Sequence, residues 1–147
     1  MDQGVYGAFQ QGLMGLAHGG HQVVAEMDPG YFATLKQFYI DGTIQRPDGV
    51  LPRATKELII MAVCAAMARF RGCRLHMERA LRAGATFREA LEALETAAIP
   101  GGLPVLWNGA EILGELMTAL GPEDGAQGEG GSAPAGSGDR SDVRGGR

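Results

Sequence analysis

The stretch from residue 51 to residue 86 constrains the fold of this chain more than any other. After Glu57 it contains a continuous apolar run, residues 58–68, which predicts a helix from about Pro52 to Ala68. A helix with no polar face is normally buried on every side. We therefore expect this helix to lie at the centre of an all-α domain, with the Glu57 carboxyl group near its beginning.

A second helix is predicted directly after the first, from about Cys73 to Ala83. Its apolar stripe comprises Cys73, Met77, Ala80 and Leu81, and His76 lies on the same stripe. The opposite side of the helix is expected to carry Arg74, Glu78, Arg79 and Arg82. A thiol and an imidazole therefore lie one turn apart, next to a helix that begins with a carboxyl group. We expect any chemistry of this chain to take place there.

The N-terminal part has a weaker pattern. Glycines interrupt the apolar spacing of residues 1–25, and each lowers helix stability, so only a marginal first helix is expected. His18 and His21 have a spacing compatible with metal binding, but no carboxylate or cysteine pattern accompanies them, and solvated loop histidines are the expectation. Asp28 followed by Pro29 predicts the start of a helix that ends near residue 39.

The C-terminal part predicts two further helices and a tail. Thr86 and Glu89 form a capping box that begins a helix ending before Pro100. The last helix begins near Pro104, and its predicted packing seam is Leu103, Leu106, Ala110, Leu113, Met117 and Leu120. Residues 121–147 are dominated by Gly, Ser, Ala and charged residues and are expected to be a disordered tail that can serve in recruitment. The prediction is thus one domain of five or six helices, residues 1–120.

Composition excludes several classes of function. The formal net charge is −4 and no cluster of Lys and Arg is present, so nucleic acid is not the expected partner. The first twenty residues lack the pattern of a signal peptide. The longest apolar run is shorter than the roughly 18 residues that a membrane span needs. The two cysteines do not make a disulfide framework of the kind found in secreted proteins. A cytoplasmic protein is therefore predicted.

Three ordered motifs resemble the carboxymuconolactone decarboxylase family, which includes the alkylhydroperoxidase-D-like (AhpD-like) proteins. They are L-P-R-x-T-K-E-L-I from residue 51, H-x-x-x-A-L-x-A-G-A-T-x-x-E-A-x-E-A-L from residue 76, and G-G-x-P-x-x-x-N-G from residue 101. The resemblance covers residues 51–120 and implies an AhpD-like helical bundle. It also implies a homo-oligomer, often a trimer or a hexamer.

The resemblance separates two branches of the family. In the redox branch a Glu is followed, after eleven residues, by C-x-x-C-x-x-x-H. Glu57 and His76 have the spacing of that motif, but its two cysteines would fall at Arg69 and Gly72. Cys73 is displaced by one position. Since the decarboxylase branch also lacks the cysteine pair and keeps the histidine, it is the nearer relative.

The candidate catalytic residues are Glu57, Cys73 and His76, and each has an alternative explanation. If the Glu57 carboxyl group lies against the apolar run, it loses hydration, which favours a role in proton transfer. If Glu57 is instead exposed in the first turn, it only interacts favourably with the helix dipole. A histidine on an apolar stripe is either a proton-transfer group or a hydrogen-bonded core residue. Cys73 lies at a helix start between Arg71 and Arg74, which is expected to favour its deprotonated thiolate form. The alternative is a cysteine that only packs at the start of the helix.

The remaining candidates are less specific. Cys64 is either an inert core residue or a resolving thiol. Trp107 and Asn108 are candidate substrate-binding residues, and Trp107 fits a subunit contact equally well. One His, one Glu and one Cys could bind a metal ion, but no local ligand pair reinforces them, so no metal and no cofactor are predicted.

Three functions therefore remain open. The first is a decarboxylase-like enzyme that acts on a small organic acid or lactone, with a proton relay through Glu57 and His76. The second is a thiol-dependent peroxidase or antioxidant protein that uses Cys73 alone. The third is a non-catalytic oligomeric binding or scaffold module.

Overall fold

The chain is all-α, as the sequence predicts. The computed structural model describes residues 3–121, in which there are seven α-helices, one π-helical segment and no strand. The elements in order are α1 (Gln3–Gly12), α2 (Gly19–Met27), α3 (Pro29–Lys36), η1 (Gln37–Ile44), α4 (Arg53–Ala66), α5 (Phe70–Arg82), α6 (Phe87–Gly101) and α7 (Leu103–Leu120). The predicted tail, apart from Gly121, lies outside the described residues. None of the helices in residues 3–121 has the length and apolar character that crossing a membrane requires.

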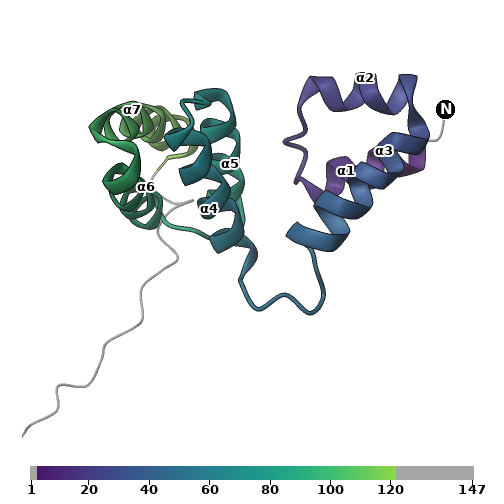
Figure 1. Cartoon of the computed structure of the whole chain (residues 1–147), viewed down its shortest axis with the longest axis horizontal. Helices are drawn as coiled ribbons and strands as arrows, with labels where there is room; N and C mark the ends of the chain where they lie inside the picture. The colour runs from purple at the N-terminus through teal and green to yellow at the C-terminus, as the bar shows by residue number, and fades with distance from the viewer. Residues whose placement is uncertain (1–2, 122–147) are drawn as a thin grey trace, which may run out of the picture.

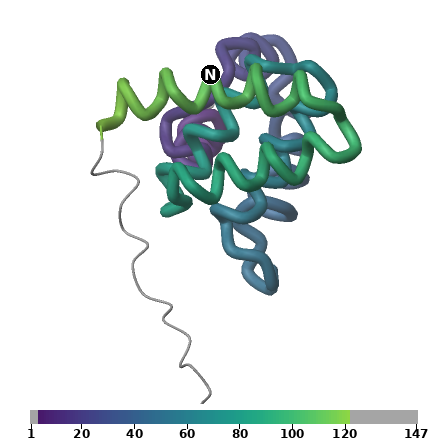
Figure 2. Tube along the Cα trace, turned by 90° about the vertical axis from the view of Figure 1, so that its left-hand side faces the viewer, coloured from purple at the N-terminus to yellow at the C-terminus, as the bar shows by residue number. Residues whose placement is uncertain are grey.

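The helices form two lobes, each with its own core (Figure 1). The N-terminal lobe, residues 3–44, buries Phe9, Leu13, Phe32 and Ile40 against one another. The C-terminal lobe, residues 53–120, has a larger core centred on side chains such as Met61, Met77 and Leu94. Figure 2 shows α6 and α7 of this lobe packed as an antiparallel pair. Residues 45–52 connect the two lobes.

The N-terminal lobe contains more helix than the sequence predicts. Met14 and Gly15 both have positive φ, 55° and 78°, and this turn separates α1 from α2. The start of α3 is as predicted, because the Asp28 side chain accepts a hydrogen bond of 2.9 Å from the Tyr31 backbone N–H. The predicted end near residue 39 was wrong, because a π-helical turn extends the helix to Ile44.

The prediction that α4 is buried on every side was also wrong. Met61 and Ala65 are buried in the C-terminal core, but Ile59 and Val63 are 49% and 52% exposed. The apolar run of α4 has neighbouring helices on only part of its circumference within one chain, and the remaining apolar side faces solvent.

The next three helices follow the sequence pattern more closely. The predicted stripe of α5 is buried throughout. The capping box at the start of α6 is confirmed, since the Glu89 N–H donates to Thr86 Oγ1 and the Thr86 N–H donates to a Glu89 carboxylate oxygen. Pro100 lies inside the last turn of α6 rather than after it. The predicted α7 seam was shifted, because the buried residues of this helix are Val105, Gly109, Leu113 and Leu116.

Candidate functional site

Glu57 and His76 form a hydrogen-bonded pair between α4 and α5. Glu57 lies in the second turn of α4 and is fully buried, and His76 lies midway along α5 with a side chain that is 12% exposed. The distance from His76 Nδ1 to Glu57 Oε2 is 2.8 Å. A carboxylate partner places the proton on Nδ1, so that Nδ1–H donates to Glu57 and Nε2 is left for another partner.

Arg53 extends this pair toward the N-terminal lobe. Its Nη2 lies 3.8 Å from Glu57 Oε1, one helical turn along α4. The same Nη2 donates a hydrogen bond of 2.5 Å to the backbone carbonyl of Gly12 in α1. Among the described residues, Glu57 Oε1 and Arg53 Nε have no hydrogen-bond partner although both atoms are buried. One oxygen of the buried Glu57 carboxylate is therefore hydrogen-bonded to His76, and the other faces the Arg53 guanidinium.

Arg79 corrects the sequence analysis, which placed it on the polar side of α5. Its side chain is only 1% exposed, three residues after His76 on the same helix. Its Nη1 donates a 2.8 Å hydrogen bond to the hydroxyl of Tyr39, and its Nη2 donates to the backbone carbonyl of Leu16. Its Nε has no partner in residues 3–121. Arg53 and Arg79 thus both reach from the C-terminal lobe to the N-terminal lobe, beside the Glu57–His76 pair.

The surroundings of Cys73 are the opposite of those expected. The side chain is fully buried in the apolar core of the C-terminal lobe, beside Met77 and Leu81. Burial raises the pKa of its thiol from 9.0 to about 11, and the neighbouring Cys64 contributes in the same direction. Arg71 and Arg74 do not reverse this effect. The expected preference for the thiolate is therefore wrong for the folded chain.

Cys64 is a free, partly buried thiol, and burial also raises its pKa, against a smaller lowering by Arg69. The two cysteines are both free.

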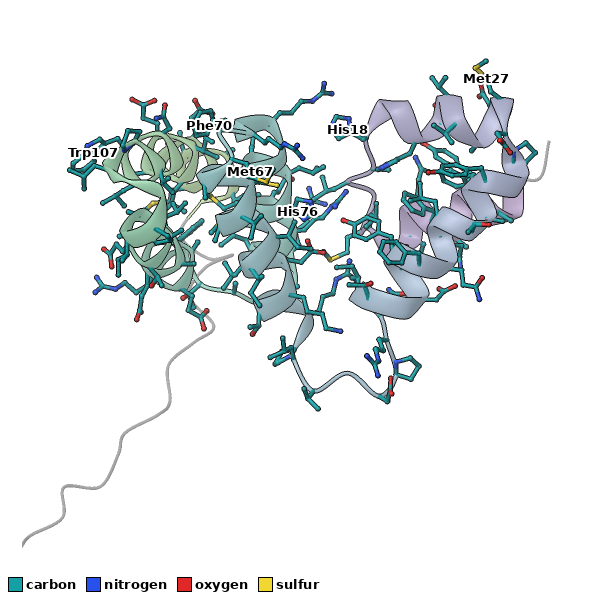
Figure 3. The ribbon with its side chains drawn as sticks, in the orientation of Figure 1. His18, Met27, Met67, Phe70, His76 and Trp107 are labelled. Carbon is teal, nitrogen blue, oxygen red and sulfur yellow. The ribbon has the colours of Figure 1, made fainter. Side chains whose placement is uncertain are left out.

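The structure does not bring Trp107 and Asn108 to the pair. Trp107 is 60% exposed, and Figure 3 shows it at the far end of the C-terminal lobe from His76, which faces the N-terminal lobe. The Asn108 side chain donates a 2.7 Å hydrogen bond to the backbone carbonyl of Pro104 in its own helix. Within the described part of the chain, neither makes a hydrogen bond or ion pair with Glu57 or His76.

The two N-terminal histidines lie next to each other at the start of α2, with ring centroids 6.0 Å apart. His18 is the N-cap of α2, and its backbone N–H donates to His21 Nδ1 at 3.0 Å. His21 also packs edge-on against Phe9, with ring centroids 4.8 Å apart, so the expectation of a solvated loop residue was wrong for it. Burial lowers the pKa of His21, and the charges of His18 and Arg79 lower it further. Residues 3–121 contain no group of three or more His, Cys, Asp or Glu side chains arranged to hold a metal ion.

Tyr39, Arg53 and Arg79 are site residues that sequence reasoning missed. The only signal for Arg79 was its position three residues after His76, which puts both on one side of α5. Nothing local marked Tyr39, because its hydrogen-bond partner lies 40 residues away in the sequence.

Comparison with known proteins agrees with this fold. The family model described as the carboxymuconolactone decarboxylase family matches residues 29–115. A crystal structure of a protein from Burkholderia xenovorans LB400, provisionally named a carboxymuconolactone decarboxylase, superposes with a TM-score of 0.62 at 21% sequence identity. The match covers 77% of this chain and 89% of that one, and at this identity it supports the fold alone. No curated protein matches the chain.

Proposed function

This chain belongs to the carboxymuconolactone decarboxylase family, and we propose that it is a decarboxylase-like enzyme in which Glu57 and His76 relay a proton. The observation that carries the proposal is the 2.8 Å hydrogen bond from His76 Nδ1 to the buried carboxylate of Glu57. A histidine whose Nδ1–H is held by a carboxylate has its ring oriented and its Nε2 available as a general acid or base. The substrate class is a small organic acid or lactone.

The chemistry requires a carbonyl group that can accept an electron pair. When the bond to the carboxylate carbon breaks and carbon dioxide leaves, the electron pair of that bond is delocalised onto the carbonyl oxygen as an enolate. His76, protonated on both nitrogens, then delivers the Nε2 proton to a carbon atom of this enolate. The imidazole becomes neutral and keeps its Nδ1–H on Glu57. Since the His76 side chain is 12% exposed, solvent can return the proton.

Carbon dioxide release tests this function directly. The assay uses carboxymuconolactone, the compound for which the family is named, and two β-keto acids, acetoacetate and oxaloacetate, whose ketone can accept the electron pair. In D2O the product is expected to carry one deuterium at the carbon that His76 protonates, because His76 exchanges its Nε2 proton with solvent. Heat-inactivated protein gives the background rate. Release no faster than this background for all three acids would overturn the proposal.

We also propose that the chain forms a homo-oligomer, as the family resemblance implies. What supports this is an apolar groove of about 670 Å³ between α4 and α6, whose lining includes Leu58, Ile59, Val63, Ala97, Ile99 and Pro100. Contiguous exposed apolar surface of this kind is typical of a protein interface. A Val63→Glu substitution should shift the sedimentation equilibrium toward the monomer, whereas Val50→Glu, at a 93% exposed position outside the groove, should not. A wild-type chain that sediments as a monomer at tens of micromolar would contradict this.

A further inference from the structure

The hydroxyl of Tyr39 has an unused donor beside the proposed site. Tyr39 lies on η1 in the N-terminal lobe and is partly buried. Its oxygen accepts the hydrogen bond from Arg79 Nη1 at 2.8 Å. Within residues 3–121 the hydroxyl donates to no acceptor, although a partly buried O–H group normally finds one. The hydroxyl proton is therefore available to a bound molecule.

Arg79 holds this hydroxyl on the side of α5 that carries His76. The guanidinium is fixed by its second hydrogen bond, from Nη2 to the carbonyl of Leu16, and by almost complete burial. Because a guanidinium is planar and its N–H directions are fixed, the Tyr39 oxygen is fixed with it. The Glu57 carboxylate is close enough to act on the same hydroxyl electrostatically. The tyrosine, the arginine and the Glu57–His76 pair thus belong to one region between the lobes.

The charges around Tyr39 favour a neutral donor. Burial raises the pKa of the phenol, and the negative charge of Glu57 raises it further. The charges of Arg79 and Arg53 and the hydrogen bond from Arg79 act in the opposite direction without reversing the shift. The phenol therefore keeps its proton at neutral pH. The N–H that it accepts from Arg79 polarises the O–H bond and makes the hydroxyl a better donor.

We infer that Tyr39 is a third catalytic residue, donating a hydrogen bond to the substrate carbonyl oxygen on which negative charge develops, and that Arg79 is its positioning residue. This inference rests on the proposed function. In this scheme Tyr39 of the N-terminal lobe stabilises the carbonyl oxygen that accepts the electron pair, and His76 of the C-terminal lobe delivers the proton. A donor aimed at a developing oxyanion stabilises the transition state more than the ground state, so its effect falls on kcat.

The Tyr39→Phe substitution removes the hydroxyl and keeps the ring. The ring packs against the N-terminal core, with its centroid 6.2 Å from that of Phe9, and phenylalanine preserves this contact. We expect kcat for carbon dioxide release from carboxymuconolactone to fall about 100-fold, with KM within threefold of the wild-type value. Tyr31→Phe is the matched control, because Tyr31 is 62% exposed and its side chain makes no hydrogen bond in the described chain. This control should retain full activity.

An isotope effect separates catalysis from a structural role. If Tyr39 stabilises the enolate oxygen, its loss slows cleavage of the carbon–carbon bond, and the ¹³C isotope effect on carbon dioxide release should rise. A variant that merely contains less folded enzyme would leave the isotope effect unchanged. Arg79→Lys, which keeps the charge but loses the fixed geometry, should lower kcat in the same direction by a smaller factor.

Failure of the role assigned to Tyr39 can be distinguished from failure of the proposed decarboxylase-like function. A Tyr39→Phe variant with at least half the kcat of Tyr31→Phe, together with an inactive His76→Gln variant, would overturn the inference and leave the proton relay in place. In an enzyme whose wild-type isotope effect lies below the intrinsic value for carbon–carbon cleavage, an unchanged effect in a slowed Tyr39→Phe variant would overturn it as well. A wild-type protein that releases no carbon dioxide would remove the reaction and the role of Tyr39 in it together.

Discussion

Cys73 and His76 lie one turn apart on α5, yet their environments support different chemistry. His76 faces the N-terminal lobe, has a carboxylate at 2.8 Å and retains 12% exposure. Cys73 faces the core of the C-terminal lobe, is fully buried, and has a pKa of about 11. A group with a charged partner and access to solvent can exchange protons, whereas a thiol in an apolar core remains protonated and unreactive.

The contrast shows that position in the fold outweighs local sequence for these two residues. Cys73 lies near a helix N-terminus between two arginines, which are features of a reactive cysteine. Desolvation outweighs them, because Cys73 points into the core while both arginines point away from it. The family relationship alone does not distinguish the two kinds of chemistry. The geometry of α5 favours proton transfer.

On the Cys73 side of this comparison, the largest expected effect is on the reactivity of the thiol. At pH 7.5 a thiol with a pKa of about 11 has roughly 100-fold less thiolate than one with a pKa of 9.0. In a Cys64→Ala variant, Cys73 should react with a disulfide reagent at least 100-fold more slowly in the folded chain than in the denatured chain. Its rate should still increase about tenfold per pH unit between pH 8 and pH 10. A folded rate equal to the denatured rate would restore the thiol-dependent peroxidase as a candidate.

The next effect concerns the partner of His76. Glu57→Gln preserves the shape of the side chain but removes the carboxylate that orients the His76 ring through its Nδ1–H. We expect kcat to fall by about ten- to one-hundredfold, the range for loss of an orienting carboxylate. Steady-state kinetics on carboxymuconolactone measure the effect, with Glu115→Gln, on the exposed side of α7, as the control. Equal kcat values for the two variants would mean that the carboxylate has no part in the reaction.

The pH dependence of stability gives a smaller effect on the side of Cys73. Its folded pKa lies above its unfolded value, so its contribution to stability is complete below about pH 9 and is lost as the pH rises toward 11. The free energy of unfolding should therefore decrease between pH 9 and pH 11 by up to about 2 kcal/mol more in the wild type than in Cys73→Ala. Urea unfolding at several pH values measures this difference. The absence of any difference would mean that the thiol ionises equally in both states.

The parts of the site that lie within neighbouring helices could be predicted from the sequence. Glu57 and His76 belong to consecutive helices, and family spacing indicated that they would meet. The stripe of α5 and the capping box of α6 depend only on local periodicity and local hydrogen bonds. These features were therefore accessible without a structure.

The remaining parts depend on contacts between lobes or on uncovered faces. Arg79 is buried because its partners, Tyr39 and Leu16, belong to the other lobe, and no local pattern contains that information. The exposure of Ile59 and Val63 was missed for a related reason. An apolar run shows that a helix can be buried, but not which of its sides a single chain covers.

The most direct test of the central claim compares His76→Gln with Cys73→Ala on the same acid. Our account predicts that His76→Gln lowers kcat for carbon dioxide release from carboxymuconolactone by a factor of about 100 to 10,000, since it removes the general acid. Cys73→Ala should remain within about threefold of the wild type, because the thiol has no part in the reaction. Retained activity in His76→Gln, or comparable loss in Cys73→Ala, would contradict the assignment of the chemistry to the Glu57–His76 pair.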